Sequence, residues 1–340
     1  MTDILFRTAV TVAIGALGAA VAFAISMPAA ILIGPALAVT LAGLAGLRTA
    51  ISDPLRDTCF VVLGLGLGAG FDPDASAAIL RWPLAFLALL VLLALTMLAC
   101  QKLLQSAFGF DPRSAVLASA PGHLSFVLSI AADSKMDAAP IAVVQSIRLL
   151  ALTLSVPFVA MGFGVSIQSV LPPSDSVMGL IPLLALAIGG IALGLVFRKL
   201  RLPAPLLLGP MALSAATHAS GLTPGSVPEW LLAPAFIGLG TMIGTRFSNM
   251  SLARFYASLG AGLAITGVAV VLSALAAIPV ALLLGIPTPH VLAAFAPGGL
   301  ETMIALGAAM GASPGFVAAC HVMRLLLLTG LIPLALARAR

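Results

Sequence analysis

Residues 121–150 read PGHLSFVLSIAADSKMDAAPIAVVQSIRLL, and residues 297–326 read PGGLETMIALGAAMGASPGFVAACHVMRLL. Each stretch begins with a Pro-Gly pair that follows an apolar segment, and each ends with an arginine set in an apolar run. Helix composition alone does not place proline, glycine and arginine in the same order at the same separation. The two stretches therefore indicate an internal duplication of the chain.

The duplication extends outward from these stretches. Residues 26–35 (SMPAAILIGP) align with residues 201–210 (RLPAPLLLGP), so the similarity reaches the first part of each copy. We therefore predict a first membrane repeat over residues 1–164, an external linker over residues 165–176 and a second membrane repeat over residues 177–340.

The composition indicates that lipid is the main solvent of the chain. Hydrophobic residues make up 61% of the sequence and charged residues 8%, and the mean hydropathy is +1.21, whereas soluble proteins have about 25% charged residues. Helices are expected because a membrane-spanning backbone must satisfy its hydrogen bonds internally. The expected apolar segments are residues 8–25, 29–47, 55–71, 82–106, 113–132 and 139–161 in the first copy, and 178–197, 203–220, 230–245, 253–284, 289–311 and 314–337 in the second.

Loop charges predict that the two copies are inverted in the membrane. The first copy has no Lys or Arg between its first two segments, whereas the second has Arg198, Lys199 and Arg201 there, and basic residues gather on the cytoplasmic side. An inversion needs an odd number of crossings per copy, so one of the six segments is re-entrant. We expect an all-α polytopic membrane protein of ten crossings. It has two inverted repeats of about five transmembrane helices each, a re-entrant or broken helix per repeat, and both termini in the cytoplasm.

The two Pro-Gly pairs are the first candidate sites. Proline removes a backbone donor and glycine lowers helix persistence, so Pro121 and Pro297 are expected to start or interrupt helices. Non-helical backbone at membrane depth survives only where protein or a water-filled cavity shields it. The freed amides at a helix N-terminus would suit an anionic group. The alternative is a plain kink or an interhelical loop.

Arg148 and Arg324 are the second candidates, because each lies well inside an apolar helix. Burial of an arginine in a membrane costs about 2.5–3.5 kcal/mol on insertion scales, so each is expected to be paired or to face a cavity. Gln145 and His321 lie three residues earlier in the sequence, on the same helical face. A structural ion pair, or a side chain that reaches the membrane surface, is the alternative.

Glu301 is an acid well inside an apolar stretch, directly after the second Pro-Gly pair, and Ser125 holds the matching place in the first copy. A desolvated carboxylate can titrate near neutrality, so Glu301, together with His321, is the candidate for proton coupling. A salt bridge between Glu301 and Arg324 is the structural alternative, and the two roles are compatible. For His123 and His321, a hydrogen-bonded core histidine is the commoner role.

Other chemistries are not indicated. The 16 Lys and Arg residues exceed the 11 Asp and Glu residues, which gives a net charge of +5, but they form no basic run. No nucleic-acid partner is therefore expected. Cys59, Cys100 and Cys320 lie far apart, and the four histidines lack a metal-ligand spacing, so no metal or cofactor is expected. The glycines from Gly64 to Gly70 lack the features of a nucleotide-binding loop and are typical of close packing between membrane helices.

The two quoted stretches resemble the AbrB-duplication membrane protein family, whose members are often described as ammonia monooxygenases or regulators. The resemblance covers nearly the whole chain and implies a bacterial inner-membrane protein of duplicated helical architecture. The first copy departs from the family's usual Pro-Gly-Gly-Leu-Ser-Glu-Met, because residues 121–127 read PGHLSFV. The acid is therefore missing in the first copy, whereas the second copy keeps Glu301.

Inverted repeats with broken helices are typical of secondary transporters, which bind their substrate near the middle of the membrane. We therefore expect a transporter of a small polar or anionic solute, with proton coupling as an option, and no catalytic residues. The partners are the lipid bilayer and the solute, and a homo-oligomer is left open. The alternatives are a membrane-bound monooxygenase-like protein and a membrane protein that regulates gene expression indirectly. The residues expected to bind the solute are Pro121, Gly122, His123, Ser125, Gln145, Arg148, Pro297, Gly298, Gly299, Glu301, Thr302, His321 and Arg324.

Overall fold

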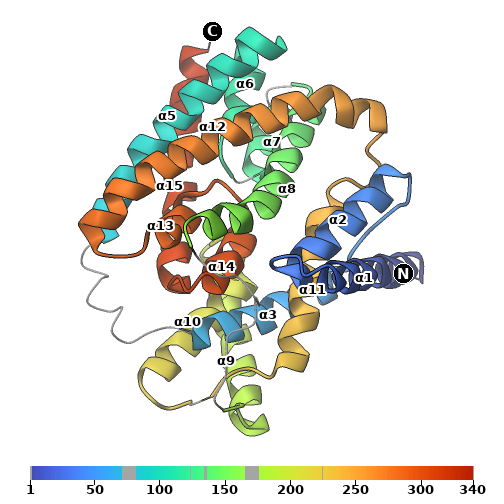
Figure 1. Cartoon of the computed structure of the whole chain (residues 1–340), viewed down its shortest axis with the longest axis vertical. Helices are drawn as coiled ribbons and strands as arrows, with labels where there is room; N and C mark the ends of the chain where they lie inside the picture. Colours follow the sequence, from blue (N-terminus) through green and yellow to red (C-terminus); the bar gives the residue numbers. More distant parts are fainter. Residues whose placement is uncertain are drawn as a thin grey trace.

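The structure of the chain is a computed structural model that describes residues 2–70, 82–122, 124–133, 136–164, 176–223 and 225–339. It is built from α-helices (Figure 1), and the described residues contain no β-strand beyond an isolated bridge between Val177 and Ser226. In chain order the helices are α1 (Thr2–Ala24), α2 (Ala30–Leu44), α3 (Asp53–Ala69), α5 (Trp82–Phe108), α6 (Pro112–Ser119), α7 (Leu124–Asp133), α8 (Ala138–Gly162), α9 (Leu180–Lys199), α10 (Pro205–Ala219), α11 (Glu229–Thr245), α12 (Leu252–Leu284), α13 (Thr288–Phe295), α14 (Leu300–Ala309) and α15 (Pro314–Arg338). Nearly all of the predicted linker, residues 165–175, lies outside the described residues.

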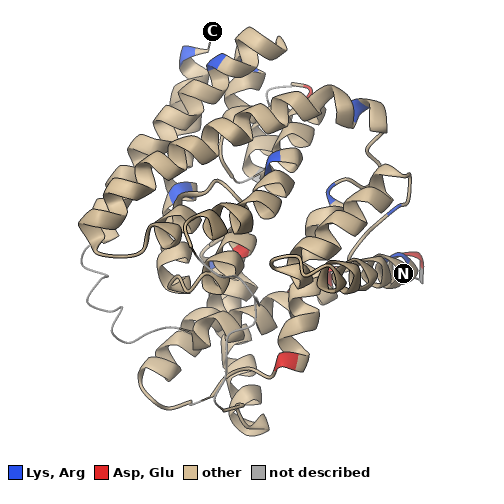
Figure 2. Ribbon diagram, viewed as in Figure 1, with Lys and Arg blue, Asp and Glu red and all other residues tan. Residues whose placement is uncertain are grey.

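Within the described residues, six helices are long and apolar enough to cross a membrane: α1, α5, α8, α9, α12 and α15. Figure 2 shows how few charged residues these helices carry. The predicted helical architecture is thereby confirmed, and the six apolar helices are consistent with a polytopic membrane protein. The helices α2 and α10 have 15 residues each and α3 and α11 have 17 each, which corresponds to lengths of about 23 to 26 Å. These four helices would complete the ten predicted crossings, and that topology stays a prediction.

The fifth predicted segment of each half is two helices rather than one. α6 ends at Ser119 and α7 begins at Leu124, and α13 ends at Phe295 and α14 begins at Leu300. Both Pro-Gly pairs lie in the gaps, where the missing proline N–H and the conformational freedom of glycine oppose a continuous helix. Gly122 has a φ of +108°, which only glycine adopts readily. The two halves of the described chain thus share one order of seven helices.

The turn before the second helix of each half has the same unusual backbone. Ala29 precedes α2 with a φ of +52°, and Ala204 precedes α10 with a φ of +40°. Alanine rarely occupies this left-handed region. Its occurrence at both aligned positions shows that the two turns have the same local geometry.

The helices form two groups in space (Figure 1). The first group, which we call the six-helix group, consists of α1, α2, α3, α9, α10 and α11, which pack mainly on one another. The second, the eight-helix group, consists of α5 to α8 and α12 to α15. Packing between the groups is sparse and involves mainly α8, α14 and α15 on one side and α2, α3 and α11 on the other. Each group therefore draws helices from both halves of the sequence.

Glycines allow the close packing of the six-helix group. Gly64 of α3 lies against the carbonyl of Leu207 in α10, and Gly240 of α11 lies against the carbonyl of Leu32 in α2. A Cβ at either glycine would collide with backbone atoms of the neighbouring helix. This confirms the packing role predicted for Gly64, and Gly240 has the same role in the second half, as small residues do in membrane interiors.

Candidate functional site

α8 binds carbonyl groups that the first helix break leaves free. Arg148 Nη2 donates a hydrogen bond to the Ala120 carbonyl at 3.0 Å, and Gln145 Nε2 donates to the Leu117 carbonyl at 2.8 Å. The Arg148 residue is only 2% exposed. Carbonyls in the last turn of a helix lack intrahelical partners and carry partial negative charge. The end of α6 therefore supplies the partner that a buried arginine needs.

α15 repeats this arrangement at the second break. Arg324 Nη1 donates to the Ala296 carbonyl at 2.8 Å, and Nη2 donates to the Gly298 carbonyl at 2.9 Å. Arg324 is also 2% exposed, and it forms no ion pair with Glu301. Both arginines therefore act as clamps on the breaks in this conformation, and neither lines the cavity described below.

The helix break of the first half contacts Arg324, the arginine that binds the helix break of the second half. A Cβ built on Gly122 would lie 3.4 Å from Arg324 Nε and 3.5 Å from Arg324 Nη2, so the glycine backbone packs against the guanidinium group. The Nε atoms of Arg324 and of Arg148 have no hydrogen-bond partner among the described residues. The two breaks thus lie together in the eight-helix group, although more than half of the chain separates them.

Substitution of Gly122 by alanine is expected to destabilise the protein by about 1–3 kcal/mol, because alanine is strained at the positive φ of this position, although its methyl group would make only ordinary van der Waals contact with Arg324. Thermal unfolding of the purified protein in detergent measures the effect. Gly267→Ala is the matched control, since nothing lies within 4 Å of a Cβ at that position in α12. Equal unfolding temperatures for the two variants would contradict the need for glycine at the positive φ of position 122.

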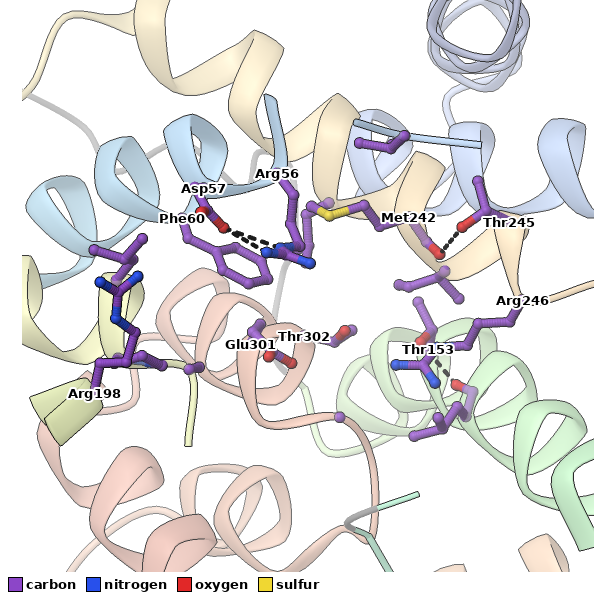
Figure 3. A pocket seen from close by; sticks show the side chains of 18 residues that line it. Arg56, Asp57, Phe60, Thr153, Arg198, Met242, Thr245, Arg246, Glu301 and Thr302 are labelled. Carbon is purple, nitrogen blue, oxygen red and sulfur yellow. Dashed lines mark hydrogen bonds and ion pairs between the residues drawn. The ribbon is translucent and has the colours of Figure 1, made fainter. Parts of the chain in front are cut away.

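A cavity of about 600 Å³ lies between the two helix groups (Figure 3). The six-helix group contributes side chains from α3, α9, α10 and α11, and the eight-helix group contributes side chains from α8 and α14. Of the predicted site residues, Gly299, Glu301 and Thr302 line it. Its volume is typical of sites that enclose a small molecule.

Positive charge exceeds negative charge around this cavity. Arg56 lines it but is neutralised, because Nη2 lies 2.8 Å from Asp57 Oδ1 and Nη1 lies 2.8 Å from Asp53 Oδ1. Arg198 and Arg246 also line the cavity, and they have no ion-pair partner in the described part of the chain. The cavity therefore offers two uncompensated guanidinium groups to a bound solute.

Glu301 lies in the first turn of α14, on the wall of the cavity. The positive end of the helix dipole favours a carboxylate there, which explains how an acid is accommodated within an apolar stretch. No hydrogen bond or ion pair joins the Glu301 side chain to another described residue. Its carboxylate is thus available to a solute or to a proton from the cavity.

The structure divides the predicted site residues into two sets. Gly299, Glu301 and Thr302 line the cavity, whereas the remaining described members lie at the breaks and their clamps. His321 is fully buried, with Nδ1 2.9 Å from the Val317 carbonyl and Nε2 without a partner among the described residues. His123 lies outside the described residues, as does the side chain of Ser125.

Arg198 and Arg246 are not among the site residues predicted from the sequence, in which Arg198 indicated only the cytoplasmic side of the membrane. The structure shows that both also line the cavity. One signal was available, since each follows an apolar segment and neither has an acid within one helical turn in the sequence. Which segment ends meet is nevertheless a property of the tertiary structure.

Among the described residues, no three His, Cys, Asp or Glu side chains lie close enough together to hold a metal ion. Cys59, Cys100 and Cys320 are buried and free.

The fold and the cavity define an all-helical protein with helices able to span a membrane and a solute-sized cavity beside a helix break. The chain belongs to the AbrB family, whose model, described as "Transition state regulatory protein AbrB", matches residues 31–339. It is similar to "Putative regulator AbrB" of Escherichia coli (strain K12), with 27% identity over 321 residues, 90% of this chain and 89% of that protein. It is also similar to "Uncharacterized protein YhjN" of Bacillus subtilis (strain 168), with 28% identity over 241 residues, 66% of this chain and 62% of that protein. No solved structure matches the chain.

Proposed function

We propose that the protein is a secondary transporter that carries a small polar or anionic solute across the bacterial inner membrane. The observation that carries this proposal is the cavity of about 600 Å³, which side chains of both helix groups line and which reaches the first turn of α14 at the second break. Secondary transporters bind their solutes where helices are interrupted. The relatives in two bacteria support the bacterial setting.

The sparse packing between the two groups supports a transport cycle. The six-helix group is held together by glycine-mediated backbone contacts, whereas the eight-helix group contains both breaks and both arginine clamps. Alternating access works by the movement of one rigid bundle against another around the bound solute. A shift of the eight-helix group along the six-helix group would change the side from which the cavity is reached.

Matched elements support two inverted repeats. Arg148 bonds the Ala120 carbonyl and Arg324 bonds the Ala296 carbonyl, at corresponding positions of the two halves. In Figure 1, α5 runs obliquely from lower left to upper right, and the corresponding helix α12 runs from the upper right to the lower left. Helices that correspond in sequence but run in opposite directions are what an inverted repeat requires.

The distribution of arginines orients the molecule in the proposal. Arg56, Arg198 and Arg246 all line the cavity, and basic residues near helix ends favour the cytoplasmic side. We therefore place the mouth of the cavity on the cytoplasmic side in this conformation, together with both termini. This orientation agrees with the ten crossings predicted from the sequence.

Transport is tested by measuring flux into proteoliposomes across a panel of small organic anions, amines and ammonium, with and without a pH gradient. We expect saturable uptake of at least one anionic solute that empty liposomes lack. The absence of saturable flux for every solute, with protein shown to be correctly inserted, would reject the transporter.

Glu301→Gln is expected to abolish the pH dependence of this flux, because the cavity then lacks the carboxylate proposed to carry the proton. Uptake driven by an imposed pH gradient should fall to the level measured without the gradient. Glu229→Gln is the matched control, since Glu229 also lies in the first turn of a helix but does not line the cavity. If Glu301→Gln keeps its pH dependence, the coupling role assigned to Glu301 fails.

A membrane-bound regulator is the second candidate, favoured by the family description and by the name of the Escherichia coli relative. We propose that such a role would be indirect, through the concentration of the transported solute. Transcripts of a deletion strain complemented with a flux-defective variant test this, because regulation that persists without flux would indicate a direct role. Stoichiometric copper or iron in the purified protein would instead favour the monooxygenase-like alternative.

A further inference from the structure

The cavity has its two uncompensated cations at separate places on its wall. Arg198 comes from the last turn of α9 and Arg246 from the C-terminal end of α11. Figure 3 shows them on opposite sides of the cavity, with Glu301 and Thr302 between them. Since Arg56 is already paired with Asp57, the charges left for a ligand are positive at both ends and negative in the middle.

We propose that the cavity binds a short dicarboxylate, with one carboxylate at Arg198 and the other at Arg246. A guanidinium group presents two parallel N–H donors that match the two oxygens of a carboxylate. A monocarboxylate would leave one of the two arginines without a partner. This inference rests on the proposed function, because it names the solute class that the transporter would carry.

The residues in the middle of the cavity indicate a further feature of the ligand. A dicarboxylate bound between the arginines passes Glu301, whose carboxylate would repel an electron-rich group and accept a hydrogen bond from a donor. A hydroxyl group on the carbon chain supplies such a donor, and Thr302 adds a hydroxyl on the same wall. The apolar lining residues Leu149, Leu239 and Ile243 suit the methylene carbons. The cavity therefore favours a hydroxylated dicarboxylate over its unsubstituted analogue.

Equilibrium binding to the full-length protein in phosphatidylcholine nanodiscs tests the proposal, with radiolabelled L-malate and succinate as probes and propionate and inorganic phosphate as competitors. We expect malate to bind more tightly than succinate, and propionate to need at least about a tenfold higher concentration to compete, as the loss of one charge-assisted contact implies. Inorganic phosphate should compete no better than propionate, because it cannot reach both arginines.

Site variants locate the binding. Arg198→Gln and Arg246→Gln are each expected to weaken malate binding by at least about tenfold, while Arg198→Lys and Arg246→Lys retain part of it because the charge remains. Arg254→Gln, on an exposed arginine that does not line the cavity, should leave binding unchanged. Glu301→Gln should reduce the preference for malate over succinate, since an amide oxygen accepts a weaker hydrogen bond from the malate hydroxyl than a carboxylate does.

Several results would overturn the dicarboxylate site. These are propionate binding as tightly as malate, or unchanged binding in both arginine variants. A failure of malate to bind monodisperse protein would also contradict the proposal. Displacement of malate by phosphatidylglycerol would do so too, because it would assign the arginines to lipid headgroups. Saturable flux of a different solute without malate binding would reject this inference and leave the transporter standing. Arginine-dependent malate binding without any flux would reject the transporter and leave the dicarboxylate site standing.

Discussion

Replacement of Arg324 by methionine is expected to destabilise the protein by about 2–4 kcal/mol and to abolish flux. The substitution removes the hydrogen bonds to the Ala296 and Gly298 carbonyls, at 2.8 and 2.9 Å, and leaves both buried carbonyls without that partner. Each unsatisfied buried group costs about 1–3 kcal/mol. Methionine also removes the cost of burying the charged guanidinium group. The net loss of folding free energy is therefore smaller than the sum of the two unsatisfied carbonyls.

Comparison with the first half makes this prediction specific. Arg148→Met removes a single hydrogen bond, to the Ala120 carbonyl, and is expected to lower the unfolding temperature less than Arg324→Met. Arg338→Met, at an exposed arginine of α15, should leave the temperature unchanged. Arg324→Lys should recover only part of the stability, because one ammonium group matches the two carbonyls less well than a guanidinium fork. Wild-type stability in Arg324→Met would show that the clamp does not hold the break.

The second large effect is expected at Gly240, where alanine should destabilise the six-helix group by about 2–3 kcal/mol. The added Cβ would collide with the backbone carbonyl of Leu32 in α2, and a backbone atom cannot rotate away as a flexible side chain can. The two helices must therefore separate, with loss of packing along their length. Overpacking of this kind typically costs about 1–3 kcal/mol.

Gly330→Ala is the matched control for this substitution. Gly330 also lies within a helix, α15, but nothing lies within 4 Å of a Cβ at this position. Alanine there should stabilise the protein by about 0.5–1 kcal/mol through its higher helix propensity. Thermal unfolding of both variants in the same detergent gives the comparison. A lower unfolding temperature for Gly330→Ala than for Gly240→Ala would contradict the close approach of α11 to α2.

Much of the secondary structure could be predicted from the sequence. The apolar segments agree with the helices to within a few residues at most ends, except at the fifth segment of each half, where Pro121 and Pro297 divide one segment into two helices. Proline and glycine act locally, through the missing N–H and the permitted φ, so their effect can be inferred without knowledge of the fold. The need to pair Arg148 and Arg324 was likewise evident, because a charge in an apolar helix requires a partner wherever the helix lies.

The identity of those partners could not be predicted. The sequence offered Glu301 as the counter-ion of Arg324, whereas the structure pairs Arg324 with the Ala296 and Gly298 carbonyls. The sequence does not show which backbone carbonyl groups at a helix end lack a hydrogen-bond partner. The distance between the end of α13 and the middle of α15 depends on how the two helices pack.

The sequence by itself determined the apolar helical character, the recurrence of the Pro-Gly and arginine motifs in both halves, and the positions of the helix breaks. All of these follow from local chemistry or from the identity of residues at equal separations along the chain. The tertiary structure alone decided that helices of both halves assemble into two groups. It also decided that Gly122 packs against Arg324, and that Arg198, Arg246 and Glu301 line one cavity. The physical reason is that these contacts join residues from different helices, and helix packing depends on the shapes of whole surfaces rather than on any one motif.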